Sequence, residues 1–231
     1  MRKIIFLIIL CVTGTFLNTA LHLLTTGENL LPLYLDTVFT ITVTLLGGPI
    51  LGCLTGALTN FICHTNNFWG WEGYLFALCN IATAIITWLF MRIFPGELNL
   101  THRQIDPAAT GKNQAFAAHK KILQLDKVMN LIFVLLLLSF ALCLTISILG
   151  GLISVFIEIL RSTGEVNPAS PPNSFYSGVP LVLREILSRI PINIIDRFIS
   201  AFFGFGFALL VTFIRGVVTR GVVTKGVQTK T

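Results

Sequence analysis

An apolar hairpin in the first third of the chain constrains the fold more than any other feature. Residues 33–60 read LYLDTVFTITVTLLGGPILGCLTGALTN, so that Gly47, Gly48 and Pro49 separate two hydrophobic segments. Glycine and proline mark turns, and two apolar segments joined by such a turn predict a pair of helices within a membrane. Asp36 lies inside the first segment. Because an ionisable group at membrane depth is costly, Asp36 is a candidate functional residue; the alternative is a satisfied charge just below the interface.

Three glycines around the second segment are spaced four residues apart, at Gly48, Gly52 and Gly56. Residues four apart lie on one face of a helix, and small residues there let another helix approach closely. This face is therefore predicted to be a helix-packing face, or a docking face for a partner helix.

The composition is typical of a membrane protein. Of the 231 residues, 54% are hydrophobic and 11% are charged, whereas soluble domains carry about 25% charged residues. The apolar residues come in long runs and no polar stretch is long enough for a separate core, so residues 1–231 are predicted to form a single integral membrane domain. The five cysteines lie in or beside apolar segments without C-x-x-C spacing, which favours small apolar fillers over disulfides or metal ligands.

We predict an all-α membrane protein, a bundle of six transmembrane helices. The spans are residues 4–24, 32–46, 50–63, 74–94, 128–150 and 191–214. The first span follows Arg2 and Lys3, as the core of a secretory signal peptide would, but no A-x-A site follows it, so an uncleaved helix is favoured. The second and third spans are slightly short for a hydrocarbon core of about 30 Å, which indicates tilt, local thinning or ends buried in protein.

Less apolar segments lie between and after these spans. Residues 95–127 form the longest one, in which residues 114–125 are either an amphipathic helix on the membrane surface or part of a solvated connector. Gly150-Gly151 predicts a bend at the end of the fifth span, and residues 180–190 predict a short separate helix before the sixth. The tail, residues 215–231, repeats basic and small residues and is typical of a disordered basic end at the lipid surface.

The distribution of positive charge predicts the orientation. An even number of spans places both termini and residues 95–127 on one side, which receives most of the 16 lysine and arginine residues. Because positively charged segments stay in the cytoplasm, both termini are predicted to be cytoplasmic in a cell-membrane protein. The net charge of +6 therefore reports topology rather than binding to nucleic acid.

Polar residues of four spans fall near the outer ends of their helices on this topology. They are Asp36 in the second span, Asn60 in the third, Asn80 in the fourth, and Asn193, Asp196 and Arg197 on one face of the sixth. A few hydrogen-bonding groups in an apolar surrounding are what a binding site for a small polar molecule requires. The alternative is that Asp196 and Arg197 only pair with each other or with lipid headgroups.

The loop before the fourth span, HTNNFWGWE, places Trp69, Trp71 and Glu72 on the same side. Tryptophans at such positions are typical interfacial anchors. The functional alternative is a lid whose rings stack on a ligand. With the amide and carboxylate residues nearby, this alternative predicts a small, soluble, ring-containing nutrient as the substrate.

Signatures of enzymes are missing from the sequence. It contains no G-x-x-x-x-G-K-[ST] loop with which to energise transport, no H-E-x-x-H and no G-x-S-x-G. The four histidines are scattered over both predicted sides of the membrane. The chain is therefore predicted not to be an enzyme and to need no metal or cofactor.

Six spans, a tight hairpin reading LGGPILGCLTGALTN and no ATPase motif make the chain similar to the substrate-binding (S) component of energy-coupling factor transporters. The segments LYLDT before the hairpin and PINIIDRFIS at the start of the last span also resemble members of this family with unassigned substrates. The resemblance covers about residues 31–214. It implies high-affinity capture of a vitamin or similar micronutrient from outside, by the outer loops and the outer halves of the later helices.

The resemblance also implies partners. S components dock on a transmembrane coupling protein driven by two cytoplasmic ATPases, and they topple in the membrane to release the substrate inside. Docking in the family uses an A-x-x-x-A face on the first span. The nearest equivalents in this sequence are Cys11, Thr15 and Thr19, which are small but not alanine. In that respect the chain departs from the family pattern.

Two other classes of function remain open. One is a membrane sensor domain that reads an external ligand for a signalling partner; the short basic tail, with no kinase or coiled coil, disfavours it. The other is an assembly protein without a ligand, in which the polar outer cluster would be surplus. The substrate is not identified either, because riboflavin, thiamine, biotin, a cobalamin precursor and a queuosine precursor all suit an aromatic and amide-lined pocket.

Overall fold

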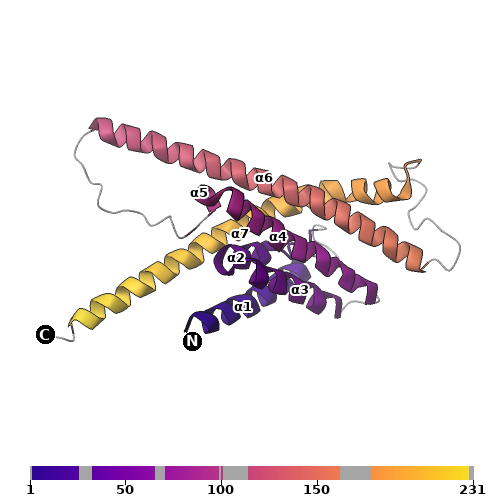
Figure 1. Cartoon of the computed structure of the whole chain (residues 1–231), viewed down its shortest axis with the longest axis horizontal. Helices are drawn as coiled ribbons and strands as arrows, with labels where there is room; N and C mark the ends of the chain where they lie inside the picture. Colours follow the sequence, from indigo (N-terminus) through magenta and orange to yellow (C-terminus); the bar gives the residue numbers. More distant parts are fainter. Residues whose placement is uncertain are drawn as a thin grey trace.

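The structure is a computed structural model that describes residues 2–25, 33–65, 71–98, 100, 114–161 and 178–228. Side chains are described for residues 4–25, 33–65, 72–98, 100, 125–161 and 178–217. All regular elements in these ranges are helical (Figure 1): α1 (Arg2–Thr25), α2 (Val38–Gly47), α3 (Pro49–Thr65), the 3-10 helix η1 (Trp71–Phe76), α4 (Ala77–Ile93), α5 (Pro95–Leu98), α6 (Gln114–Arg161) and α7 (Leu181–Gln228). The all-α class is confirmed for this part of the chain.

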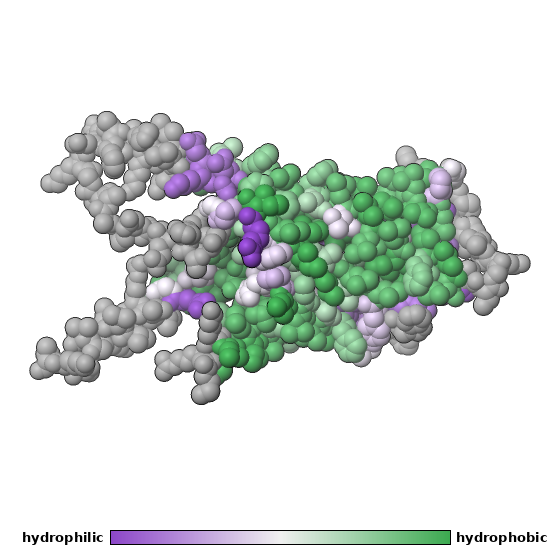
Figure 2. All heavy atoms as spheres, viewed as in Figure 1, coloured by the Kyte–Doolittle hydropathy of each residue, from purple (hydrophilic) through white to green (hydrophobic). Residues whose placement is uncertain are grey.

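Four helical segments are long and apolar enough to cross a membrane. They are Ile4–Thr25, Glu72–Ile93, Leu125–Arg161 and Leu181–Val217. Figure 2 shows apolar side chains over most of the body on this face, with hydrophilic residues toward its two ends. These features fit a multi-pass membrane protein, as the composition predicts. α2 and α3 have only 10 and 17 residues.

α2 is a half-length helix at the centre of the bundle. Its 10 residues rise about 15 Å, whereas a hydrocarbon core is about 30 Å thick. Its side chains from Val38 to Leu45 are all buried, and it packs against α1, α3, α4 and α7. A polar backbone can leave the helical state at membrane depth only where protein surrounds it, and α2 meets that condition. The helix starts at Val38, six residues after the start of the predicted span 32–46.

The turn between α2 and α3 depends on Gly48. This residue has φ of +91°, which an L side chain rarely adopts, and its N–H donates to the carbonyl oxygen of Thr44 at 2.9 Å. Pro49 then opens α3, at the first helical position where its missing N–H leaves nothing unsatisfied. A Cβ on Gly48 would meet no atom within 4 Å, so Gly48 serves the turn and does not belong to the predicted packing face.

Gly52 and Gly56 do form a helix-packing face on α3. A Cβ at Gly52 would overlap the hydroxyl of Thr44 in α2 and lie 3.1 Å from the Cβ of Ala84 in α4. A Cβ at Gly56 would lie 3.0 Å from the backbone oxygen of Asn80. Two of the three glycines therefore let α3 approach its neighbours within the protein.

α6 and α7 are continuous helices of 48 residues, which corrects several boundaries predicted from the sequence. α6 joins residues 114–125 to the fifth span, and α7 joins residues 180–190 to the sixth and continues into the basic tail as far as Gln228. Gly150-Gly151 makes no break: a Cβ on Gly151 would lie 3.0 Å from the backbone of Ile186, so this pair lets α7 pack closely against α6. In Figure 1 the start of α6 and the end of α7 project beyond the other helices.

Asn18 ties α1 to the start of α2. Its Oδ1 accepts the backbone N–H of Phe39 at 2.8 Å, which satisfies one of the unpaired donors at the first turn of α2. Its Nδ2 donates to the hydroxyls of Thr40 at 3.0 Å and Thr59 at 3.3 Å. The side chain is fully buried. One asparagine of α1 therefore holds α2 and α3 together.

Replacing Asn18 with alanine should lower the free energy of unfolding by about 2–4 kcal/mol, because it leaves a buried N–H unsatisfied and removes two further hydrogen bonds. The change is measured as the apparent Tm of the detergent-purified protein. Asn130→Ala, on an exposed position of α6, is the matched control and should change stability by less than about 0.5 kcal/mol. Equal Tm values for the two variants would contradict the role of Asn18.

Candidate functional site

A non-helical segment, residues 33–37, leads into α2 at the candidate site. Leu35 has φ of +42°, a conformation that residues other than glycine rarely adopt. Its backbone N–H donates to Oδ1 of Asp196 in α7 at 2.9 Å. Strained residues persist only where their surroundings fix them, and they cluster at functional sites. The contact with Asp196, from a residue 161 positions away, holds the start of α2 in place.

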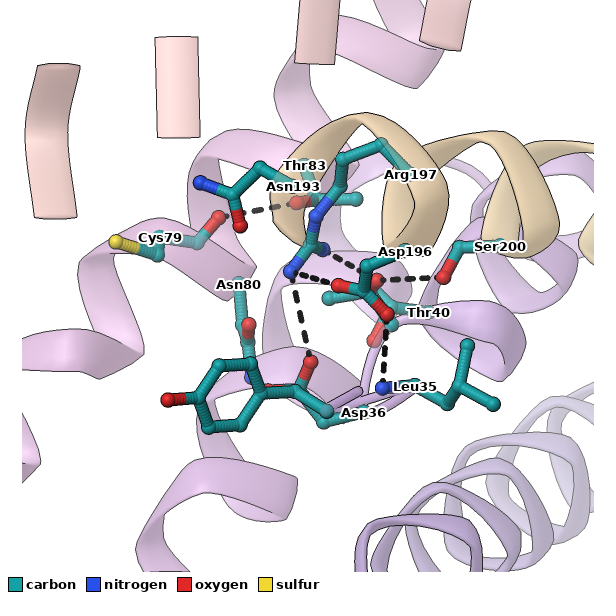
Figure 3. A network of polar contacts seen from close by, with 12 residues as sticks. Leu35, Asp36, Thr40, Cys79, Asn80, Thr83, Asn193, Asp196, Arg197 and Ser200 are labelled. Atoms are coloured by element: carbon teal, nitrogen blue, oxygen red, sulfur yellow. Dashed lines mark hydrogen bonds and ion pairs between the residues drawn. The ribbon is translucent and has the colours of Figure 1, made fainter. Parts of the chain in front are cut away.

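Arg197 of α7 lies at the centre of the site (Figure 3). Its guanidinium is 2.7 Å from Oδ2 of Asp196 and 3.8 Å from Oδ1 of Asp36. It also donates to the hydroxyl of Thr37 at 2.5 Å. Arg197 and Asp196 are 4% and 0% exposed, so they form a buried ion pair, whereas the side chain of Asp36 keeps 14% exposure. Asp196 and Arg197 thus pair with each other. Arg197 also contacts Asp36 and donates to Thr37.

Asn80 connects α4 to the same site. Its Nδ2 donates to Oδ2 of Asp36 at 2.9 Å and to the backbone oxygen of Gly56 at 3.3 Å. Asn80 is 2% exposed, and the lack of a side chain at Gly56 allows this approach. The structure therefore brings together four of the predicted site residues. We call Asp36, Asn80, Asp196 and Arg197 the charged cluster.

Asn193 and Asn60 flank the charged cluster. Asn193, one turn before Arg197 on α7, donates from Nδ2 to the hydroxyl of Ser147 in α6 at 2.9 Å. Asn60 is 5% exposed and lies one turn after Gly56 on α3. Its Oδ1 is buried and has no hydrogen-bond partner within the part of the chain that the structure describes. Asn193 therefore ties α7 to α6, and Asn60 offers an unused acceptor.

The aromatic loop is only partly placed. Trp69 and the side chain of Trp71 lie outside the described residues, so their role as anchors or as a lid stays a prediction. Glu72 forms an ion pair with Arg161 at 3.3 Å, between η1 and the end of α6. The side chain of Arg161 is 48% exposed. Among the described residues, Glu72 thus pairs with Arg161 rather than with the charged cluster.

The residues predicted for docking on α1 lie against the protein itself. Cys11 and Thr15 are 4% and 5% exposed, and the hydroxyl of Thr55 in α3 donates to the sulfur of Cys11 at 3.3 Å. Thr19 donates to the backbone oxygen of Thr15 at 3.0 Å and is half-buried. In this conformation the small-residue face of α1 packs inside the bundle.

Several residues of the site were missed from the sequence. Thr37 and Ser200 are fully buried, and their hydroxyls are 3.3 Å apart beside Arg197. The backbone of Leu35 was missed as well. Thr37 directly follows Asp36, and Ser200 lies one turn after Asp196, so the helical spacing offered a signal for Ser200. No sequence pattern in residues 33–46 indicated that residues 33–37 are non-helical.

The described part of the chain contains no group of three His, Cys, Asp or Glu side chains that could hold a metal ion. The five cysteines are all free thiols, and four of them are buried. Their positions are consistent with the predicted role of small apolar fillers. What the charged cluster provides chemically is one guanidinium, two carboxylates and an amide, assembled in an apolar surrounding.

Comparison of the chain with protein-family models, with curated proteins and with solved structures gave no significant match.

Proposed function

We propose that the chain is the substrate-binding membrane subunit of an importer of the energy-coupling factor type. It captures a vitamin-like micronutrient from outside and passes it to a transmembrane coupling protein driven by two cytoplasmic ATPases. The observation that carries the proposal is the charged cluster, in which Arg197, Asp196 and Asp36 meet at the non-helical entry to α2. Charged groups among apolar helices are expensive and mark solute pathways more often than structure.

The half-length of α2 supports a binding role. Helices interrupted at membrane depth expose backbone groups and a helix end to a solute, and small-molecule sites of membrane proteins are often built there. Here the helix starts at Val38, directly beside Asp36 and Thr37. The side chain of Asp36 is 14% exposed, which makes it the most exposed charged side chain of the cluster.

The proposal includes a six-pass topology with both termini in the cytoplasm. Residues 33–47 and α3 then form two short, tilted spans packed against α1, α4 and α7. In Figure 1 the start of α1, the start of α6 and the end of α7 lie toward the same end of the bundle. These segments hold eight of the 16 lysine and arginine residues of the sequence, which supports a cytoplasmic position for that end.

Native mass spectrometry of the protein purified from its own host tests the proposal. We expect a retained small molecule of vitamin size, and co-purification of a coupling protein with ATPases. Asp36→Asn should lose the small molecule, because the substitution removes a charge from the site while conserving its shape. Asp126→Asn, on an exposed position at the start of the apolar part of α6, is the control and should retain it.

A signalling partner in place of the ATPases would support the sensor class instead. A protein without any adduct or ATPase partner, even after incubation with a mixture of vitamins, would contradict the proposal.

A further inference from the structure

The seam between α6 and α7 holds a guanidinium outside the charged cluster, that of Arg189, which lies about two turns after the start of α7. In Figure 1 the end of α6 and the start of α7 lie at the same end of the bundle. Nη2 of Arg189 donates to the hydroxyl of Ser154 in α6, and the guanidinium carbon lies 5.5 Å from the ring centroid of Phe76 in η1. A Cβ on Gly150 would lie 3.4 Å from Nη1, so α6 leaves room for the group. Residues of η1 and α6 therefore hold this guanidinium of α7 in place.

The guanidinium of Arg189 forms no ion pair with a carboxylate among the side chains that the structure describes. Its Nε is buried and has no hydrogen-bond partner in the same part of the chain. Three other arginines of α6 and α7 are paired: Arg161 with Glu72, Arg184 with Glu185, and Arg197 with Asp196. A buried donor without an acceptor costs free energy, and the cost is larger for a charged group. Arg189 therefore lacks an acceptor.

Two carboxylates occupy neighbouring turns of the same helices. Glu185 lies one turn before Arg189 on α7 and is 4.0 Å from Arg184. Glu158 lies one turn after Ser154 on α6, and one of its oxygens is buried without a hydrogen bond among the described residues. Neither carboxylate forms an ion pair with Arg189. Glu158 is nevertheless the alternative acceptor within the protein, so a test of any ligand at Arg189 has to separate the two.

We propose that Arg189 binds an oxyanion, which is the carboxylate or phosphate group of a small molecule or of a lipid headgroup. A planar guanidinium matches these groups through paired N–H donors, and stacking on an aromatic ring leaves its edge free for them. Phe76 and Ser154 act as positioning residues. The charged cluster reaches α7 at Asp196, about 10 Å further along the helix axis, so the two sites are distinct. The inference goes beyond the proposed function and does not depend on it.

Thermal unfolding in a phosphate-free maltoside detergent tests the site. Inorganic phosphate and acetate are the probes, and sodium chloride at the same ionic strength is the reference. We expect phosphate to raise the Tm by about 3 °C at roughly ten times its Kd, and this shift should disappear in Arg189→Gln. Arg161→Gln removes the same charge at the end of α6 and should keep the shift. Because phosphate also stabilises proteins by exclusion from their surface, equal shifts in the wild type and Arg189→Gln would overturn the inference.

Arg189→Lys separates recognition by the guanidinium from the effect of its charge. Lysine keeps the positive charge but not the planar pair of donors, so the Kd for phosphate should rise about tenfold. An unchanged Kd would show general attraction by positive charge and would overturn a site built on the guanidinium.

Glu158→Gln distinguishes an external oxyanion from a partner within the protein. This variant removes a carboxylate that competes for Arg189, so we expect it to bind phosphate more tightly. If Glu158 instead holds Arg189, Glu158→Gln and Arg189→Gln each lower the Tm, and the double variant loses no more than either one. That result would overturn the inference. Glu165→Gln, outside the described residues, is tested in the same way.

Lipid addition identifies the source of the oxyanion. Phosphatidylglycerol and a phosphate-free glycolipid are each added to the delipidated protein, and the Tm is measured. A larger shift with phosphatidylglycerol that is lost in Arg189→Gln would assign the site to a lipid headgroup. Equal shifts with the two lipids, together with an Arg189-dependent shift by phosphate or acetate, would assign it to a soluble ligand. If no probe gives a shift that depends on Arg189, the inference is wrong.

Discussion

Replacing Arg197 with glutamine should be the most destabilising single change in the charged cluster. The substitution leaves Asp196 with no exposure and without its partner at 2.7 Å, and it also removes the donor to Thr37. Breaking a buried ion pair from one side costs about 3–5 kcal/mol, which corresponds to a drop in Tm of about 10 °C for a chain of this size. Heating the detergent-purified protein before size-exclusion chromatography measures the loss.

Two further variants make this prediction specific. Asp196→Asn combined with Arg197→Gln removes both charges of the pair, and we expect it to recover much of the stability lost in Arg197→Gln alone. Arg161→Gln breaks the ion pair with Glu72. Because the side chain of Arg161 is 48% exposed and water screens the pair, this variant should lower the Tm far less than Arg197→Gln. A double variant as unstable as the single one would show that packing, and not charge, explains the loss.

Gly204→Ala should destabilise the protein, whereas Gly206→Ala two residues later should not. A Cβ on Gly204 would lie 2.7 Å from the backbone oxygen of Val38 and 2.9 Å from the Cβ of Ile41, both in α2. The backbone of Val38 and the Cβ of Ile41 are fixed by the buried helix α2, so neither can shift to make room for the added methyl group. Overpacking of this kind costs about 1–3 kcal/mol. The close approach also carries the hydrogen bond from the hydroxyl of Thr42 to the carbonyl oxygen of Gly204, at 2.9 Å.

Gly206 is the matched control because a Cβ there would meet no atom within 4 Å. Alanine is favoured over glycine inside a helix by about 0.8–1.0 kcal/mol, so Gly206→Ala should leave the Tm unchanged or raise it. Both variants replace a glycine of α7 with alanine, at positions two residues apart. Similar Tm values for both would contradict the close contact between α2 and α7.

The membrane class and the meeting of charged residues could be predicted from the sequence, because both follow from the cost of burial. Long apolar runs must leave water, and an ionisable group placed among them must find a partner. Asp36, Asn80, Asp196 and Arg197 were predicted to lie on one side from their positions along the spans, and the structure places them in contact. Their role in binding stays a prediction.

The length of α2 could not be predicted from its own sequence. Residues 33–46 read as a continuous apolar segment, and nothing in them shows that Asp196 replaces an intrahelical partner for the N–H of Leu35. The bend predicted at Gly150-Gly151 was wrong for a related reason. Glycine is used both for bends and for close packing, and only the position of Ile186 on α7 distinguishes the two uses.

The contacts of α2 with α7 have a consequence for the biogenesis of the protein. The hydrogen bonds that link Leu35 to Asp196, Thr37 to Ser200 and Thr42 to Gly204 join residues 161, 163 and 162 positions apart. During synthesis, the ribosome has to complete most of the chain before α2 can obtain these partners. A helix of this length is a poor stop-transfer signal by itself, and the non-helical segment before it would stay unsatisfied in lipid. We therefore expect α2 to enter its final position last, although it is translated second, and nascent chains that end before α7 to be targets for membrane proteolysis.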